Sequence, residues 1–295
     1  MKGFFKGTAT AMITPFYNDG GVNFEAFGKM IEYQIANGTD ALVILGTTGE
    51  PSTMTAEEKT AVMKYAIQKI AGRAKVIFGS GSNCTATAVE ASKLAEQLGA
   101  DGLLCVTPYY NKCTQKGIVE YYKAICGAVK IPVIAYNVPP RTGVNILPAT
   151  AEELAHIPNM AGIKEACGNM EQICETMRRV RPYCDVYSGD DNLNLPILAI
   201  GGAGIISVVS NIAPKQVKEV YTYVAKGDLE SANRVQDAIL PLIDACFTEV
   251  NPIPVKAGCD MIGLDAGVPR APLTELEDAH KKIMRERIDK VGIKL

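Results

Sequence analysis

Lys164 stands at the end of an apolar, strand-like run over residues 160–163 and is followed at once by Glu165. An ammonium group at the exit of a buried strand loses its hydration, so its pKa falls. The resulting neutral amine can attack a carbonyl carbon and form a Schiff base. For a single lysine the more common alternative is a side chain that extends from the strand end into solvent. Other residues of the chain are needed to distinguish a Schiff-base lysine from one that extends into solvent.

Hydroxyl and guanidinium groups follow other strand-like runs. Thr47 and Thr48 lie between two glycines, in a segment that predicts a tight turn whose hydroxyl and N–H groups suit an anion. Tyr136 ends a second run, and Tyr110 follows a third. Arg141 comes after two prolines in the loop behind Tyr136, which predicts a partly preorganised guanidinium for a carboxylate. Turn formation, core packing and a surface ion pair are the alternative roles for these residues.

Two further segments are open to more than one interpretation. Asp190 and Asp191 follow a strand-like run at 185–188, where they could bind Mg²⁺ or, more simply, cap a helix. The glycine-rich segment 201–204 could bind a phosphate or form a tight turn. Neither segment by itself identifies a ligand.

All these residues need a scaffold that brings strand ends together. Apolar runs alternate with amphipathic, helix-like stretches, which predicts an α/β fold with strands buried on both faces. The strand-like runs cover residues 8–14, 41–45, 76–79, 102–106, 133–136, 161–164, 185–188 and 204–208. The helix-like stretches include residues 56–70, 86–98, 117–129, 149–156 and 170–180. Eight strands with intervening helices predict a (β/α)8 TIM barrel, and a doubly wound sheet is the alternative, weakened because no GxGxxG follows the first run.

A barrel of this kind separates the lysines. Lys75 and Lys130 precede strands, whereas Lys164 ends one and belongs to the face where barrel enzymes carry out chemistry. The strand pattern stops near residue 226. The helix-like stretches beyond it cover residues 228–249, 254–262 and 272–289. We therefore expect a catalytic barrel domain over 1–225 and a C-terminal helical appendage over 226–295.

The composition argues against several classes of protein. With 47% hydrophobic and 21% charged residues, the 295-residue chain is typical of soluble globular proteins. A net charge of −2 does not point to binding of nucleic acid or of an anionic membrane. No apolar run approaches the ~20 residues of a membrane span, and the amino terminus lacks a signal-peptide core, so a cytoplasmic location is expected.

Cysteine and histidine usage argues against a metal centre. Nine cysteines are scattered without a CxxC pair, which indicates reduced thiols and neither a disulfide framework nor a zinc site. Only two histidines are present, His156 and His280, and we expect both to be structural or solvated. Carbonyl chemistry in this chain is therefore expected to use a lysine, with no metal and no other cofactor.

Together these residues predict a site like that of a class I aldolase. Lys164 would form an imine with a keto acid. The turn at Thr47 and Thr48 would bind the carboxylate of that acid, and tyrosine and threonine hydroxyls would relay protons. Arg141 would bind the carboxylate of a second substrate.

Seven segments resemble the dihydrodipicolinate synthase / N-acetylneuraminate lyase family. They are GTTGE at 46–50, TPYYN at 107–111, YNVPPRTG at 136–143, GIKEACGN at 162–169, SGDD at 188–191, GGAGIIS at 201–207 and NPIPVK at 251–256. They run over nearly the whole chain in the family's order, and as a set they are highly specific. Arg141 favours the synthase branch, because sialic-acid lyases share the lysine and the tyrosine before it but do not typically carry this Arg-Thr-Gly.

The resemblance implies catalytic roles. Lys164 would form the Schiff base with pyruvate, and Tyr136 would transfer protons and stabilise the imine. Thr48 and Tyr110 would complete a hydroxyl relay to solvent, with Tyr110 supplied by a neighbouring subunit. Such an arrangement requires at least a dimer, and the family implies a homotetramer built as a dimer of dimers.

The resemblance also implies how substrates are bound. Thr47 and Thr48 would hold the pyruvate carboxylate, and Arg141 would engage the carboxylate of aspartate semialdehyde. Gly189 and Ile206 match positions that line the site. The enamine would attack the aldehyde, and cyclisation would release the heterocycle of lysine and diaminopimelate biosynthesis.

The chain departs from lysine-inhibited members of the family. Lys59 and Thr87 stand where those members have His and Glu, and Ala56 replaces another frequent His. Tyr109 and Asn83 are retained. A bound lysine would meet a like charge and lose a carboxylate partner, so we expect weak or absent feedback inhibition.

Two other functions compete with this one. Another pyruvate-dependent aldolase, for a 2-keto-3-deoxy sugar acid or N-acetylneuraminate, would share the chemistry at Lys164 and differ in the second substrate. A non-catalytic barrel that serves as a binding module would not react at all. The presence of Lys164, Tyr136, Tyr110 and Thr48 together argues against a decayed site.

Overall fold

The computed structural model describes residues 2–293 and contains a closed barrel of eight strands in chain order. The predicted (β/α)8 TIM barrel is therefore confirmed. The strands are β1 (Gly7–Ala11), β2 (Ala41–Ile44), β3 (Lys75–Gly79), β4 (Gly102–Val106), β5 (Val133–Asn137), β6 (Met160–Glu165), β7 (Asp185–Ser188) and β8 (Gly204–Ser207). The α-helices are α1 (Phe24–Ala36), α2 (Ala56–Ile70), α3 (Thr85–Gln97), α4 (Gln115–Ala128), α5 (Pro139–Thr142), α6 (Pro148–Ala155), α7 (Met170–Val180), α8 (Asn194–Ala199), α9 (Pro214–Ala225), α10 (Leu229–Ala245), α11 (Ile253–Met261) and α12 (Asp278–Val291). Short 3-10 helices are η1 (Thr47–Gly49), η2 (Pro51–Thr53), η3 (Asp191–Leu193) and η4 (Val209–Asn211).

The chain forms two compact units. The first unit contains residues 2–7 and 76–206, and so includes β4 to β7 with α3 to α8. The second contains residues 8–75 and 207–293, and so includes β2 with α1, α2 and α9 to α12. The candidate site residues are divided between these units.

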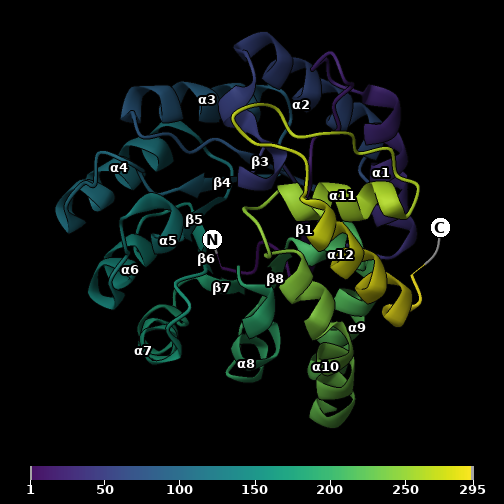
Figure 1. The fold of residues 1–295 in the computed structure, drawn as a ribbon. Helices are drawn as coiled ribbons and strands as arrows, with labels where there is room; N and C mark the ends of the chain where they lie inside the picture. The colour runs from purple at the N-terminus through teal and green to yellow at the C-terminus, as the bar shows by residue number, and fades with distance from the viewer. Residues whose placement is uncertain (1, 294–295) are drawn as a thin grey trace. The chain divides into compact units, whose positions relative to one another are not determined.

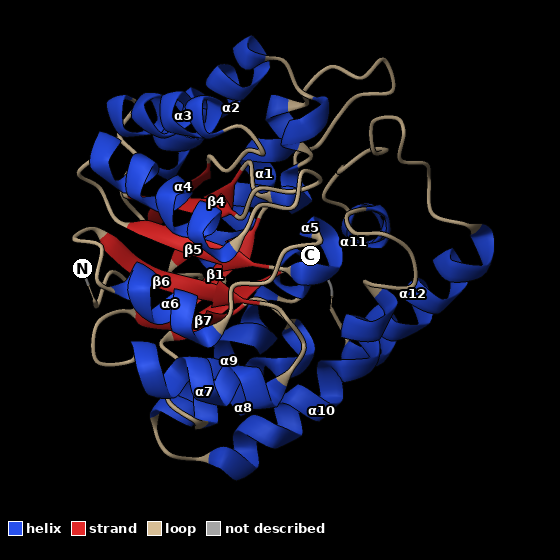
Figure 2. Ribbon diagram, turned by 90° about the vertical axis from the view of Figure 1, so that its left-hand side faces the viewer, coloured by secondary structure: helices blue, strands red, loops and turns tan. Residues whose placement is uncertain are grey.

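Parallel strands form the core of the first unit. In the register of β4, β5 and β6, Leu103 lies opposite Val133 and Tyr136 lies opposite Lys164. Helices α4, α6 and α7 cover the outer side of β5 to β7 (Figure 2). The strands are buried on both faces, which explains why they read as continuous apolar runs in the sequence.

Helices dominate the later part of the second unit. Helix α10 packs against α9 and α12, and α11 packs against α12 (Figure 1). The helices predicted over 228–249 and 254–262 are observed as α10 and α11. The helix predicted over 272–289 begins later, because the Glu277 N–H donates to Glu249 Oε1 at 2.9 Å and holds the preceding residues in an extended loop. The division of the chain at residue 225 into barrel and appendage stays a prediction.

Capping residues define two helix starts that the sequence predicted. The Thr55 hydroxyl accepts a hydrogen bond from the Glu58 N–H, and the Glu58 carboxylate accepts one from the Thr55 N–H, so α2 begins with a capping box. Asn169 caps α7 by accepting from the Gln172 N–H at 3.1 Å. Both helices begin at the residue predicted.

The first strand is shorter than the predicted run over 8–14. The Ile13 N–H donates to Asn211 Oδ1 at 3.2 Å, and the Thr14 hydroxyl donates to the Gly49 carbonyl at 2.7 Å. Side chains and turns here replace a neighbouring strand as hydrogen-bond partners. An apolar run in the sequence cannot distinguish these partners from those of a sheet.

Candidate active site

Lys164 and Tyr136 are neighbours inside the first unit. They face each other across β5 and β6, and Lys164 Nζ lies 4.2 Å from the centroid of the Tyr136 ring. Both residues are buried, with exposed fractions of 3% and 8%. This burial rules out the alternative in which Lys164 extends into solvent.

Burial lowers the pKa of Lys164 to about 8, because its ammonium form loses hydration. The Asp191 carboxylate opposes this shift, and the Arg141 guanidinium adds to it. A lysine with the ordinary pKa of 10.5 is almost fully charged at neutral pH, so the shift increases the fraction of nucleophilic amine.

Tyr136 supplies a protonated phenol beside this amine. Burial raises its pKa to about 12, with a smaller opposing influence from Arg141. A neutral phenol can accept a proton at oxygen and donate its own, so Tyr136 is suited to move protons at the Lys164 nitrogen.

Gly189 leaves space for the Lys164 side chain. A Cβ atom at this position would lie 2.8 Å from both Cγ and Cε of Lys164, which is closer than real Cβ contacts. The Gly189 N–H donates to the Glu165 carbonyl at 2.8 Å, so its backbone is held against β6. The glycine predicted to line the substrate site therefore packs directly on the Lys164 side chain.

A polar pair on the opposite face of the same strands fixes their register. Asn137 lies opposite Glu165, and its Nδ2 lies 3.0 and 3.1 Å from the two carboxylate oxygens. The Cys167 N–H donates to the same carboxylate at 2.8 Å. Because side chains alternate along a strand, this outward pair supports the inward pair of Tyr136 and Lys164. No role was predicted for Glu165 from the sequence, although its place directly after the lysine was a signal.

Asp190 and Asp191 have separate structural roles. The Asp190 carboxylate accepts from the Asn192 N–H at 3.1 Å and caps η3, which confirms the capping interpretation. Asp191 is buried and accepts from the Asn194 side-chain amide at 3.0 Å. The Asp191 charge also acts on Lys164, where it partly offsets the effect of burial.

Tyr110 and Arg141 lie at the surface of the first unit. They line a shallow, open pocket together with Tyr109, Lys112, Thr142 and Gly143. Tyr110 is 88% exposed and has a φ of 75°, which is uncommon for a tyrosine, so it is not part of the buried cluster around Lys164. Arg141 lies in the helical turn α5 and not in the predicted loop, because prolines at the start of a turn preset its φ.

Ile206 is buried in β8, which begins at the last residue of the glycine-rich segment 201–204. Gly201 has a φ of 101°, and a Cβ at Gly202 would lie 2.8 Å from the Ile197 carbonyl oxygen. A Cβ at Gly204 would collide with the carbonyl oxygen of Gly7. These close backbone approaches favour the tight-turn interpretation of the segment over phosphate binding.

The predicted anion-binding turn lies in the second unit. Thr47 and Thr48 belong to η1, and Thr48 is buried. Asn251 Nδ2 donates to Thr48 Oγ1 at 3.0 Å, so this hydroxyl accepts one hydrogen bond and keeps its own proton for donation. Glu50 ends the turn in a left-handed conformation, with a φ of 55°.

A second buried lysine lies beside this turn. Lys256 is 0% exposed, and its Nζ lies 2.9 Å from Glu50 Oε1. No role was predicted for Lys256 from the sequence, in contrast to Lys164. The available signal was a lysine directly after residues 252–255, which are all proline or apolar.

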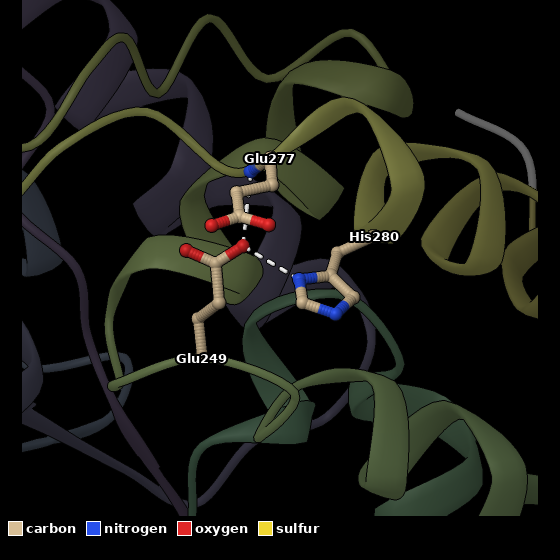
Figure 3. Close-up of side chains that lie close together, drawn as sticks. All are labelled: Glu249, Glu277 and His280. Carbon is tan, nitrogen blue, oxygen red and sulfur yellow. Dashed lines mark hydrogen bonds and ion pairs between the residues drawn. The ribbon is translucent and has the colours of Figure 1, made fainter.

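Glu249, Glu277 and His280 are a group of possible metal ligands within residues 2–293, with atoms that lie within 4.8 Å of one another (Figure 3). His280 Nδ1 lies 2.7 Å from Glu249 Oε1, which also accepts from the Glu277 N–H. These bonds attach the start of α12 to the segment after α10, so we assign the group a structural role. All nine cysteines are free in the structure.

Known proteins match the chain over almost its full length. The sequence model of the Dihydrodipicolinate synthetase family matches residues 4–291. The chain is 48% identical over 289 residues to the 4-hydroxy-tetrahydrodipicolinate synthase of Caldicellulosiruptor bescii, with 98% of each chain covered. Identity to the enzyme of that name from Alkaliphilus oremlandii is also 48% over 289 residues, with 98% and 99% covered. The crystal structure of dihydrodipicolinate synthase from Aquifex aeolicus superimposes with a TM-score of 0.96 at 42% identity, with 99% of both chains covered.

Within the part of the chain that the structure describes, every helix is too short or too polar to cross a membrane.

The named relatives are lyases, and the barrel and its buried strand-end lysine agree with that class of enzyme. The extent of these matches shows that the chain belongs to the dihydrodipicolinate synthetase family.

Proposed function

We propose that the protein is a 4-hydroxy-tetrahydrodipicolinate synthase, which condenses pyruvate with L-aspartate 4-semialdehyde in lysine and diaminopimelate biosynthesis. The observation that carries the proposal is the buried Lys164, with a pKa of about 8, against the ring of Tyr136. The names of relatives that match almost the whole chain support this choice of substrates.

The proposed reaction begins at the neutral Lys164 amine. It attacks C2 of pyruvate, and loss of water leaves an imine. Loss of a proton from C3 forms an enamine, whose carbon attacks the aldehyde carbon of the second substrate. The amino group of that substrate then attacks the imine carbon, which closes the ring and returns Lys164 to the free amine. The protonated imine itself accepts the electron pair, so the proposal requires no metal or other cofactor.

Protons must move at several of these steps. Tyr136 holds a neutral phenol beside the reacting nitrogen, and Thr48 keeps a hydroxyl proton while it accepts from Asn251. We propose that both take part in a hydroxyl relay, with Tyr110 as its third member.

Substrate carboxylates need donors at two places. We propose that Thr47 and Thr48 hold the pyruvate carboxylate, supported by a turn with hydroxyl and N–H groups at the end of β2. Gly189 and Ile206 would line the same site. Arg141 would bind the carboxylate of the semialdehyde, which suits the planar fork of a guanidinium.

The exposure of Tyr110 supports a role outside its own subunit. A tyrosine that is 88% exposed and in an uncommon backbone conformation gains contacts if a second copy covers it. We propose that the partner's Tyr110 completes the relay, in a homotetramer built as a dimer of dimers. A cytoplasmic location is proposed too, since free thiols suit a reducing compartment.

We propose that free L-lysine inhibits the enzyme weakly or not at all. Lys59 is half-buried in α2, where its charge would repel the ammonium groups of lysine. Thr87 is exposed in α3 and offers no carboxylate. Both differences remove attraction for a cationic amino acid.

Borohydride trapping tests the proposal. The protein is incubated with pyruvate and sodium borohydride, and its intact mass and peptide map are measured. One reduced pyruvate adduct on Lys164 is the expected result, and Lys164→Ala should fold and show no adduct. Folded wild-type protein without an adduct would contradict the Schiff-base mechanism and favour a non-catalytic barrel.

The second substrate is tested by turnover. Pyruvate is supplied with aspartate semialdehyde, with N-acetylmannosamine or with a sugar aldehyde in parallel reactions. Consumption of pyruvate with aspartate semialdehyde alone is the expected result. Faster turnover with either of the other aldehydes would assign the chain to another pyruvate-dependent aldolase.

A further inference from the structure

The proposed chemistry does not use a buried ion pair in the second unit. Lys256 Nζ lies 2.9 Å from Glu50 Oε1, and the two side chains are 0% and 2% exposed. The same ammonium donates to the carbonyl oxygens of Thr14 at 3.0 Å and Val268 at 3.1 Å. All three of its N–H groups therefore have an acceptor.

Glu50 is constrained as tightly as its partner. Its second carboxylate oxygen accepts from the Arg270 N–H at 2.9 Å, and its backbone is held at a φ of 55°. Removal of two charges from water costs more than burial of apolar side chains of the same volume, so stability alone does not account for such a pair. A left-handed glutamate also persists only where its surroundings enforce it.

The pair is continuous with the turn that carries Thr47 and Thr48. Glu50 follows η1 directly and is its C-cap residue. Lys256 lies in α11, in the same short segment as Asn251, whose amide donates to Thr48. Two polar side chains of one segment thus hold two positions of one turn.

A third connection passes through Thr14. Its carbonyl accepts from Lys256, and its hydroxyl donates to the Gly49 carbonyl at 2.7 Å. The turn is therefore held at Thr48, Gly49 and Glu50 in succession. Loss of the Lys256 ammonium would remove the direct bond to Glu50 and the bond that orients Thr14.

We propose that Glu50 and Lys256 are positioning residues, whose ion pair holds the turn at Thr47 and Thr48 in the geometry that binds the pyruvate carboxylate. This inference rests on the proposed function, which assigns that turn to the keto acid. Neither residue touches the substrate. Lys256 has no lone pair free for attack while all its protons are bonded, so it does not form a second pyruvate adduct.

The variants Lys256→Met and Glu50→Gln test the proposal. In folded protein, the KM for pyruvate should rise roughly 10- to 100-fold, the size expected when a binding group moves by about 1 Å. The rate of borohydride trapping on Lys164 at low pyruvate should fall by a similar factor. Because Lys164 is unchanged, kcat at saturating pyruvate should fall less than kcat/KM.

Two further variants separate positioning from stability. Ile288→Ala removes a buried side chain of α12 and should lower Tm without a change in the KM for pyruvate. The double variant Glu50→Gln, Lys256→Met leaves no unpaired buried charge, so its Tm should recover toward that of wild type. Its KM for pyruvate should nevertheless stay raised, because the bonds of the ammonium to Thr14 and Glu50 are absent.

Each outcome bears on one claim. An unchanged KM for pyruvate in folded Lys256→Met protein, or a KM that recovers together with Tm in the double variant, would overturn the positioning role. Both results leave trapping on Lys164 intact and so leave the proposed function standing. Failure of wild-type protein to trap pyruvate on Lys164 would instead contradict the proposed function. If Lys256→Met does not fold, the double variant decides the question.

Discussion

Tyr136 and Lys164 lie directly opposite each other in the parallel pair of β5 and β6, with the lysine Nζ 4.2 Å from the centroid of the tyrosine ring. The next residues of the two strands, Asn137 and Glu165, are also opposite each other and hydrogen-bonded. A shift by one residue would expose Lys164 to the helical layer and turn Glu165 inward. The hydrogen-bonded pair of Asn137 and Glu165 therefore helps to keep Tyr136 and Lys164 on the inner face of the two strands.

Imine formation should depend on the protonation of Lys164. With a pKa of about 8, the neutral fraction at pH 7 is roughly 300 times that of a lysine with a pKa of 10.5. The rate of borohydride trapping at low pyruvate should rise about tenfold per pH unit below pH 8 and level off above it. Measurement of the trapping rate across this range checks the prediction, and a rate that continues to rise to pH 10 would contradict it.

Arg141 provides a control for the same experiment. Its guanidinium lowers the pKa of Lys164, so Arg141→Met should move the ascending limb of the profile to higher pH. Trapping uses pyruvate alone and is independent of any role of Arg141 toward the semialdehyde. A limb at unchanged pH would show that burial accounts for the whole shift.

Lys164→Met should make the protein more stable at neutral pH. The folded pKa lies below the unfolded value, so the folded state binds the proton less well and burial of the lysine costs about 3 kcal/mol below pH 8. The methionine variant has a similar volume and removes this cost. Denaturant unfolding at pH 7 should show a higher free energy of unfolding for Lys164→Met.

The gain in the free energy of unfolding of Lys164→Met should depend on pH. The advantage of Lys164→Met should be constant below pH 8 and should disappear as the pH rises from about 8 to 10.5, where the unfolded lysine also loses its proton. Lys130→Met, at an exposed lysine before β5, should show no such gain. Equal stability of wild type and Lys164→Met at pH 7 would contradict the assigned cost of burial.

Local signals explain the parts of the fold that the sequence predicted well. Helix α2 begins and ends as predicted, because Thr55 and Glu58 mark its start within four neighbouring residues. Strand β4 likewise matches its apolar run. Element boundaries that depend on distant partners were predicted wrongly. The strand predicted over 8–14 ends early, where Asn211 takes over as hydrogen-bond partner, and the start of α12 depends on Glu249.

The same distinction applies to the candidate site. Lys164 and Tyr136 could be predicted because residue type and a strand end are both visible locally. The pair of Glu50 and Lys256 could not, since the two residues are 206 positions apart and no local feature selects this glutamate as the partner. Lys256 in an apolar segment was nevertheless a sign that a buried charge needed a partner.

L-Lysine should not inhibit turnover at submillimolar concentration. The charge of Lys59 would repel a bound lysine, and Thr87 lacks the carboxylate that would attract its ammonium groups. Initial rates with and without L-lysine, at subsaturating pyruvate, check this prediction. The double variant Lys59→His, Thr87→Glu should become more sensitive than wild type, and strong inhibition of wild type at submillimolar lysine would contradict the prediction.

Gly189→Ala should impair the Lys164 side chain directly. The added Cβ would lie 2.8 Å from Cγ and Cε of Lys164, so the lysine must leave its present rotamer. We expect the rate of pyruvate trapping to fall roughly 10- to 100-fold and the free energy of unfolding to fall by about 1–3 kcal/mol.

Gly127→Ala, in α4, is the matched control, because a Cβ there has no atom within 4 Å. It should trap pyruvate at the wild-type rate and be more stable by about 0.5–1 kcal/mol, as expected for alanine in a helix. Wild-type trapping by Gly189→Ala would mean that Lys164 can react from another rotamer, and that its packing against Gly189 does not control the reaction.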